Sequence, residues 1–194
     1  AQAFARHDGN SIRRRANVAT YSEVYHDFPY LSESARGVMS SGLFENEGYF
    51  RMKYYDFVDD VVPERFASGQ TNGNTTNFPL MRYADVLLMK AEALANRNTG
   101  TDLEDACDAL DLVRGRAGLA PTTAGTQEEV LAAVRLERRR ELGFESHRFF
   151  DLMRWGREIA VEALGPDIAS VWTGDRFYFP IPQSELDSNK GIEQ

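Results

Sequence analysis

Residues 126–156 constrain the fold most, because they combine a helix start, apolar periodicity and an internal run of charge. Thr126 and Glu129 have the spacing of a capping box, in which each side chain bonds the other residue's free backbone N–H. Val130 and Val134 then recur at helical spacing. The stretch therefore predicts an amphipathic helix whose apolar stripe packs on other elements.

A run of three arginines, Arg138–Arg140, lies inside this helical pattern. Helical spacing puts Arg138 on the same stripe as Val134, Glu141 and Glu145. A buried charge without a partner is strongly destabilising, so a helix that turns arginine and glutamate inward needs them paired. We expect Arg138 and Glu141 to be buried and paired, with each other or with neighbouring helices.

Four helices are expected in the C-terminal part, near residues 79–97, 102–117, 127–143 and 146–157. Pro79 suits a first helical turn, and a stripe of Leu, Ala and Tyr residues follows it. The predicted fold class is mainly α, with tetratricopeptide-like helical hairpins, irregular loops and a few short strands. A single hairpin cannot bury both of its faces, so further helices must pack on it.

Both ends of the helix predicted at 102–117 carry local signals. Thr101 and Glu104 repeat the capping-box spacing. Gly118 is placed to be the left-handed residue after the second helix, with Leu119 as its apolar contact and Pro121 as the stop. These signals predict a helical hairpin bounded by residues 79 and 117.

Composition excludes several classes of protein. The formal net charge of −8 argues against nucleic acid as the main partner, since that binding needs a basic surface. The single cysteine, Cys107, excludes an intrachain disulfide and a cysteine-based zinc site, and it lies in an apolar helical pattern. No apolar run approaches the ~18 residues of a membrane-spanning helix.

Four stretches in order resemble one known family. They are PLMRYADVLLMKAEAL (Pro79–Leu94), LVRGRAGL (Leu112–Leu119), ERRRELGFESHRFFDLMRWG (Glu137–Gly156) and FPIPQSELDSNKGIEQ (Phe179–Gln194). Together they resemble the SusD-like (RagB/SusD) family of surface glycan-binding lipoproteins.

The resemblance implies a non-enzymatic protein that hands a glycan or related nutrient to a SusC-like TonB-dependent outer-membrane transporter. It implies a location on the cell surface at the outer membrane, through a lipid anchor that is absent from this sequence. It also implies a longer parent with a helical N-terminal half, so we expect these residues to be a C-terminal portion.

We predict two domains, an irregular aromatic-rich segment at 1–77 and a C-terminal helical domain at 78–194. In the first, Arg13–Arg15 reads as a solvated or acid-paired surface, and Phe50 to Tyr55 alternate like a short strand. Exposed aromatics beside amides suit the apolar faces and hydroxyls of sugars. The predicted ligand-binding residues are Tyr21, Tyr25, His26, Phe28, Tyr30, Tyr49, Asn72, Asn74 and Trp172.

No catalytic, metal or cofactor site is predicted. Glu137, Glu141 and Glu145 have a density that a metal could use, but Glu145 lacks the histidine three residues later that di-metal helices need, because Arg148 stands there. Pairing with the interleaved arginines is the favoured interpretation. The phosphate-binding, nucleophile-elbow and dinucleotide glycine motifs are also absent from the sequence.

Two other functions stay open. One is a tetratricopeptide-like protein-interaction scaffold without a small ligand, which a lipobox cysteine upstream or an adjacent transporter gene would argue against. The other is a fragment of a hydrolase, which an activity assay on common polysaccharides would detect. The ligand itself is not given by the sequence, and neighbouring genes would be the most informative observation.

Overall fold

The structure is a computed structural model that describes residues 12–20, 22–23, 49–53, 79–165, 181–189 and 191. The chain forms two compact units, the first ending at Ser146 and the second beginning at His147. The domain boundary predicted at residue 77 lies outside the described ranges, so it stays a prediction.

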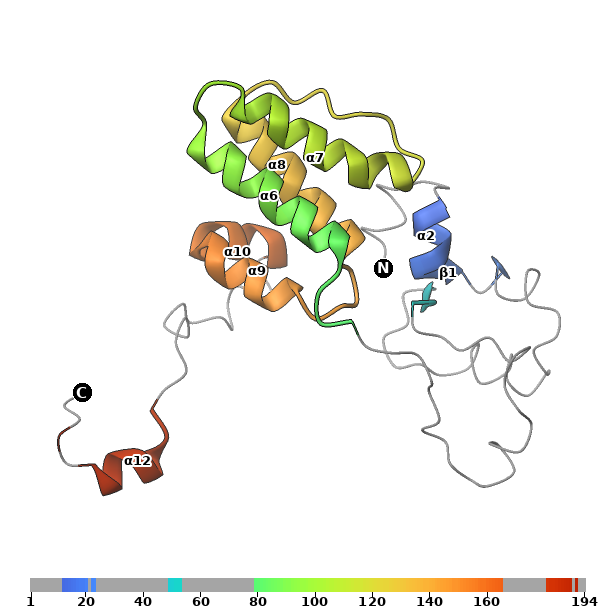
Figure 1. Cartoon of the computed structure of the whole chain (residues 1–194). Helices are drawn as coiled ribbons and strands as arrows, with labels where there is room; N and C mark the ends of the chain where they lie inside the picture. The colour runs from blue at the N-terminus through green and yellow to red at the C-terminus, as the bar shows by residue number, and fades with distance from the viewer. Residues whose placement is uncertain are drawn as a thin grey trace. The chain divides into compact units, whose positions relative to one another are not determined.

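The described residues are mainly helical, as predicted (Figure 1). The helices are α2 (Ile12–Asn17), α6 (Tyr83–Arg97), α7 (Asp102–Arg116), α8 (Gln127–Glu141), α9 (Arg148–Trp155), α10 (Arg157–Leu164) and α12 (Gln183–Ser188). Two short strands, β1 (Val18–Thr20) and β2 (Tyr49–Arg51), complete the set. Among these residues no helix has both the length and the apolarity needed to cross a bilayer.

Helices α6, α7 and α8 form the core of the first unit, and Figure 1 shows them side by side. The α6–α7 turn uses left-handed backbone at Asn98, with φ 49°, and at Gly100, with φ 55°. Helix α8 runs antiparallel to α6, because Gln127 at its start donates to the Ala95 carbonyl near the end of α6 (2.9 Å). At the opposite ends, Arg82 bonds to Glu141.

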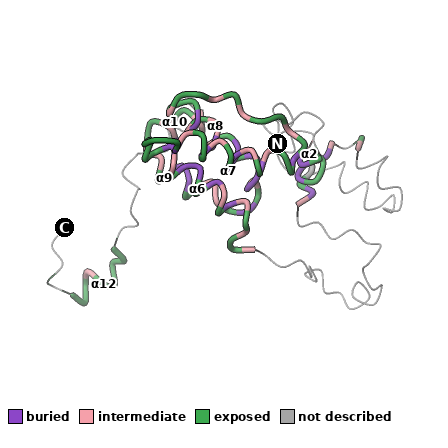
Figure 2. Tube along the Cα trace, turned by 45° about the horizontal axis from the view of Figure 1, so that its top comes forward, coloured by how far each residue is buried: buried purple, intermediate pink, exposed green. Residues whose placement is uncertain are grey.

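The core between these helices is built mostly from small and branched side chains, and Figure 2 shows the buried faces turned inward. Its buried members are Leu88, Ala91, Ala95, Ala106, Ala109, Leu110, Val113, Val130, Val134 and Leu142. The alanines let the helices approach closely, and the branched residues fill the space between them. Cys107 is half-buried beside this core, in line with its predicted apolar role.

Helix α6 begins at Tyr83, so the predicted start at Pro79 is wrong. Arg82 is the residue before the helix and has extended backbone, with φ −142° and ψ 163°. This conformation directs its guanidinium to the carboxylates of α8 instead of continuing the helix back to Pro79. Leu80 and Tyr83, predicted on the apolar stripe, are consequently exposed.

Two of the three predicted end signals are confirmed. The Thr126 hydroxyl accepts from Glu129 N–H, and the Glu129 carboxylate accepts from Thr126 N–H. Gly118, at φ 72°, donates to the Gly115 carbonyl while Leu119 donates to Arg114, which is the paired bonding of a Schellman motif.

The capping box predicted at Thr101 and Glu104 is wrong, since Thr101 makes no side-chain cap at the start of α7. The Asp102 carboxylate instead bonds the backbone N–H and the hydroxyl of Thr99 in the preceding turn (both 2.9 Å). Arg97 bonds the same carboxylate. The local turn thus uses an aspartate that the capping-box pattern does not consider.

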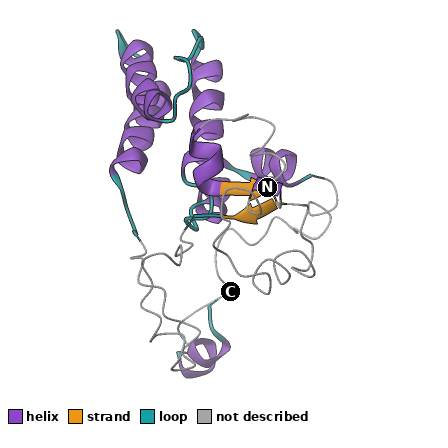
Figure 3. Cartoon of the chain, turned by 90° about the vertical axis from the view of Figure 1, so that its right-hand side faces the viewer, coloured by secondary structure: helices purple, strands orange, loops and turns teal. Residues whose placement is uncertain are grey.

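The two strands pair antiparallel, with Val18 opposite Arg51 and Thr20 opposite Tyr49 (Figure 3). Helix α2 leads directly into β1, and the Met52 N–H donates to the Asn17 carbonyl (2.9 Å). The strand predicted from residue 50 is therefore confirmed in part, because it ends at Arg51. The solvated reading of Arg13–Arg15 is wrong for Arg13 and Arg14, which are buried, while its acid-paired reading is confirmed.

In the second unit α9 and α10 contact each other across Gly156, whose φ of 99° breaks the helix. Phe149 and Phe150 meet edge to face with ring centroids 5.5 Å apart, yet both are exposed. Leu152 is buried, and Trp155 is half-buried with the Arg154 guanidinium 5.1 Å from its ring. Helix α9 therefore buries its Asp151–Leu152 side, while Phe149 stays exposed.

Candidate functional site

Most of the predicted ligand-binding residues lie outside the described part of the chain. This holds for Tyr21, Tyr25, His26, Phe28, Tyr30, Asn72, Asn74 and Trp172, which therefore stay predictions. Tyr49 is described, as the first residue of β2, and it is half-buried opposite Thr20.

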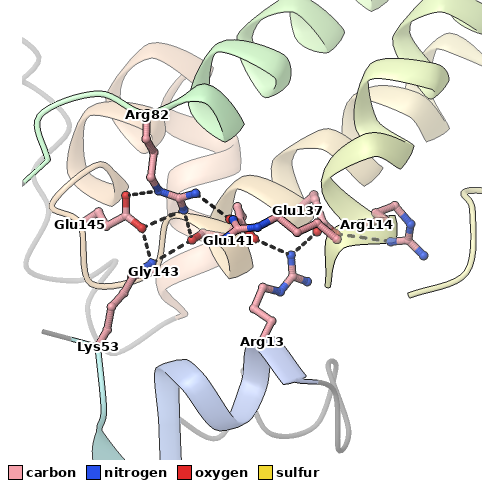
Figure 4. A network of polar contacts seen from close by, with 9 residues as sticks. Arg13, Lys53, Arg82, Arg114, Glu137, Glu141, Gly143 and Glu145 are labelled. Carbon is pink, nitrogen blue, oxygen red and sulfur yellow. Dashed lines mark hydrogen bonds and ion pairs between the residues drawn. The ribbon is translucent and has the colours of Figure 1, made fainter. Parts of the chain in front are cut away.

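The described residues instead concentrate charge along the end of α8. Glu137 and Glu141 lie one helical turn apart, and Glu145 follows in the turn after the helix. All three are buried, with Glu137 fully enclosed. Figure 4 shows that Arg13, Lys53, Arg82 and Arg114 converge on them from other elements. We call these seven residues the ionic cluster.

Arg82 makes the most extensive contacts in the ionic cluster. Its Nε donates to Glu145 Oε2 (2.7 Å), and its Nη1 donates to Glu141 Oε1 (2.7 Å). Its Nη2 donates to Glu145 Oε1 (2.8 Å) and to the Glu141 carbonyl (2.6 Å). The planar guanidinium thereby ties the first residues of α6 to the end of α8 with charge-assisted bonds.

Arg13 and Lys53 attach the α2–β2 region to the same acids. Arg13 Nη1 donates to Glu137 and also to Glu141 Oε2 (3.1 Å). Lys53 pairs with Glu145, and its Nζ donates to the carbonyls of Glu141 (3.0 Å) and Gly143 (3.2 Å). Lys53 thus also satisfies carbonyl groups at the C-terminal end of α8, where the helix leaves them free.

A separate buried pair lies deeper along α8. Arg138 Nη1 donates to Asp85 Oδ1 on α6 at 2.7 Å, and both side chains are at most 6% exposed. The prediction that Arg138 and Glu141 are buried and paired is therefore confirmed. Their partners belong to other elements, so each pair ties α8 to a neighbouring segment.

The electrostatic surroundings of Glu141 and Glu145 lower the pKa of both carboxylates. Burial alone would raise the pKa of Glu141, but the hydrogen bond and charge of Arg82, with help from Arg13, lower that pKa below its usual range. Burial likewise opposes ionisation of Glu145, and Arg82 and Lys53 lower its pKa. Burial lowers the pKa of Lys53, which Glu145 only partly offsets.

A cavity of ≈ 390 Å³ opens beside the ionic cluster. The described residues around it are Ile12, Arg13, Ala16, Asn17, Lys53, Pro79, Arg82, Arg116, Ala117, Glu141 and Glu145. Its size lies within the roughly 300–1,000 Å³ of small-molecule sites. Sequence reasoning missed this cavity, because its walls come from segments far apart in the chain.

The arrangement suits binding better than metal chemistry. Within the described ranges no group of three or more His, Cys, Asp or Glu side chains could hold a metal ion. The acids of the cluster face arginine and lysine, which compete with a metal for the same oxygens. Arg82, Arg138 and Glu141 connect elements of the fold.

Comparison with known proteins identifies the family. Residues 5–169 match the model of the SusD family, so the chain belongs to that family. This confirms the resemblance drawn from the four sequence stretches.

Curated relatives agree with this assignment. The chain is 34% identical to SusD-like protein P38 of Formosa agariphila over 128 residues, which are 61% of this chain and 24% of P38. It is 29% identical to SusD-like protein P2 of the same organism over 152 residues, which are 72% of this chain and 28% of P2. The chain thus spans about a quarter of the length of the curated relatives it matches.

A solved structure is also similar, a SusD-like protein from Bacteroides fragilis. The sequence identity is 33%, and the match covers 56% of this chain and 19% of that chain, with a TM-score of 0.46.

Proposed function

We propose that this chain is part of a non-catalytic protein that binds a glycan or a related nutrient at the cell surface. Membership of the SusD family supports a nutrient-binding role. The further proposal is delivery of the ligand to a SusC-like TonB-dependent transporter of the outer membrane, with a lipid anchor holding the protein there. Surface binding followed by transfer requires reversible contacts and no bond cleavage.

The observation that supports a non-catalytic function is the lowered pKa of two carboxylates, Glu141 and Glu145. A general acid in glycoside hydrolysis needs a raised pKa so that it can hold a proton near neutral pH. The pKa values of Glu141 and Glu145 are lowered, and both carboxylates accept from Arg82. These groups are ionised and committed to holding segments together, which argues against an acid role.

The proposed ligand site therefore lies outside the helical motif. The facing sides of α6, α7 and α8 pack their apolar residues in the core, and the carboxylates of the ionic cluster pair with cations. We place the ligand on the aromatic segments Tyr21–Tyr30 and Leu43–Tyr55, with the amides of Asn72 and Asn74 as hydrogen-bond partners. The support is chemical, because sugar rings stack on aromatic faces and bond to amides.

The test is titration calorimetry of the full-length protein with a panel of oligosaccharides, followed by chromatography of each mixture after prolonged incubation. We expect saturable binding of at least one oligosaccharide and no change in its chain length. Slow hydrolysis that disappears on mutation of one carboxylate would overturn the proposal.

A protein-interaction scaffold is the second candidate, favoured by apolar side chains on the outer side of α6. Tyr83, Val86 and Met89 are all exposed there. If the panel gives no binding, and Tyr83→Asp abolishes binding to a protein partner other than a transporter while keeping the melting temperature, the scaffold function replaces glycan binding.

A further inference from the structure

The cavity beside the ionic cluster carries an excess of positive charge. Four cations line it, Arg13, Lys53, Arg82 and Arg116, against two carboxylates, Glu141 and Glu145. Adding the neighbouring pair Arg114 and Glu137 leaves the excess at two charges. The whole chain has a net charge of −8, so this local excess is opposite in sign to the molecule. A concave site with focused positive potential attracts anions.

Asn17 places a side-chain amide in the wall of this cavity. The residue is only 4% exposed, and it lies at the end of α2. Its backbone carbonyl accepts from the Met52 N–H. A side-chain amide can donate to and accept from the hydroxyl groups of a ligand.

Arg116 is the least committed cation of the cavity. Its side chain is 79% exposed, and its ion pair with Glu141 Oε1 is long, at 3.6 Å from Nη1, which is beyond hydrogen-bond distance. Arg13, Arg82 and Lys53 make closer contacts with glutamates, as Figure 4 shows. A guanidinium with only a long ion pair can still bind an incoming carboxylate through two parallel bonds.

The rest of the cavity wall is apolar and suits the C–H face of a sugar ring. It is formed by Ile12, Ala16, Pro79 and Ala117. Sugars present C–H faces of this kind beside their hydroxyl groups, so one cavity offers an apolar wall, an amide and a guanidinium.

We propose that this cavity binds a sugar acid, with Arg116 receiving its carboxylate and Asn17 bonding to one of its hydroxyls. That the ligand is a sugar rests on the proposed function. That the sugar carries a carboxylate is inferred from the positive charge of the cavity. This site is separate from the proposed aromatic segments, and it adds a second place where an acidic ligand is held.

The test is calorimetry of the full-length protein with D-glucuronate, D-glucose and acetate. We expect glucuronate to bind at least about 10-fold more tightly than either control, because it alone supplies both the carboxylate and the hydroxyls. Arg116→Gln should weaken glucuronate binding about 10-fold or more, and Asn17→Ala should also weaken it. Added salt should weaken binding, since the carboxylate contact is charged.

Arg139→Gln is the matched control, because Arg139 is an exposed arginine on α8 that is not part of the cavity wall. It removes the same charge and should leave glucuronate binding unchanged. The inference is overturned if glucuronate binds no better than glucose or acetate, or if Arg116→Gln and Arg139→Gln have equal effects. Arg116 is largely exposed, so its variant should fold even if Asn17→Ala does not.

A neutral oligosaccharide separates this inference from the proposed function. If it binds and Tyr25→Ala weakens it while glucuronate shows no preference, only the sugar-acid site fails. If neither class of ligand binds, the proposed function fails as well.

Discussion

Arg138 joins α8 to α6 through a buried ion pair with Asp85. Arg138→Ala should lower the free energy of unfolding by about 3–5 kcal/mol, because it leaves the Asp85 carboxylate buried without its cation. The measurement is urea unfolding followed by circular dichroism. Arg139→Ala is the control, since that neighbouring arginine is exposed and should change stability by no more than about 0.5 kcal/mol. A melting temperature within a degree or two of the parent for Arg138→Ala would contradict the account.

Acid should weaken the α2–β1 region through Glu23. Its bidentate hydrogen bond with Arg14 (2.6 Å for each oxygen) lowers the pKa of Glu23 from 4.5 to about 2. A carboxylate with a depressed pKa stabilises the fold above its unfolded value, and this contribution is lost as pH falls through the folded value.

Stability should therefore fall as pH drops from about 4.5 towards about 2, with Glu141 and Glu145 contributing in the same direction. Glu23→Gln should flatten this slope in unfolding curves recorded across that range. An unchanged slope in the variant would show that the Arg14–Glu23 contact does not stabilise the folded chain.

For single residues, burial could be predicted from the sequence, but the long-range partners could not. The inward orientation of Arg138 and Glu141 followed from their position on an apolar helical stripe. The partner of Glu137 did not follow, because Arg13 lies 124 positions away and no local pattern links the two. Lys53 was likewise assigned to an alternating strand, with no signal that its ammonium would reach Glu145.

At the scale of elements, the starts of α7 and α8 form a natural comparison. Thr126 caps α8 through a reciprocal pair of bonds with Glu129, whereas Thr101 makes no side-chain cap. Thr126→Ala should therefore destabilise the protein by about 1 kcal/mol, and Thr101→Ala should have a much smaller effect. Thermal unfolding of both variants checks this, and equal losses would contradict the assignment of the cap.

Thr101 and Thr126 also show how far a helix cap can be predicted from residue spacing. Both fit the same spacing, so the pattern alone gives both the same prediction. At α7 the following aspartate, Asp102, bonds back to Thr99 and also to Arg97, and that arrangement replaces the cap. The Schellman end at Gly118 was predictable because its glycine, apolar and proline signals agree with one another.

At the scale of the whole molecule, the helical class and the family were both predictable. Long periodic stretches specify helices, and four ordered motifs covered the family's scaffold. The cavity was not predictable, since α2, β2, α6 and α7 contribute its walls and only tertiary packing brings them together. The aromatic ligand segments remain a chemical prediction, because Tyr21 and residues 24–48 lie outside the described residues.

The central claim of the proposed function is that glycan binding by the aromatic segments and the stability of the helical core reside in different parts of the chain. Its most direct test measures glycan affinity and melting temperature together for Tyr25→Ala and Tyr83→Ala in the full-length protein. Tyr83 is an exposed aromatic on the helical scaffold and serves as the matched control. The account predicts that Tyr25→Ala weakens glycan binding at an unchanged melting temperature, while Tyr83→Ala leaves the affinity unchanged. Loss of stability in step with affinity in Tyr25→Ala would contradict it.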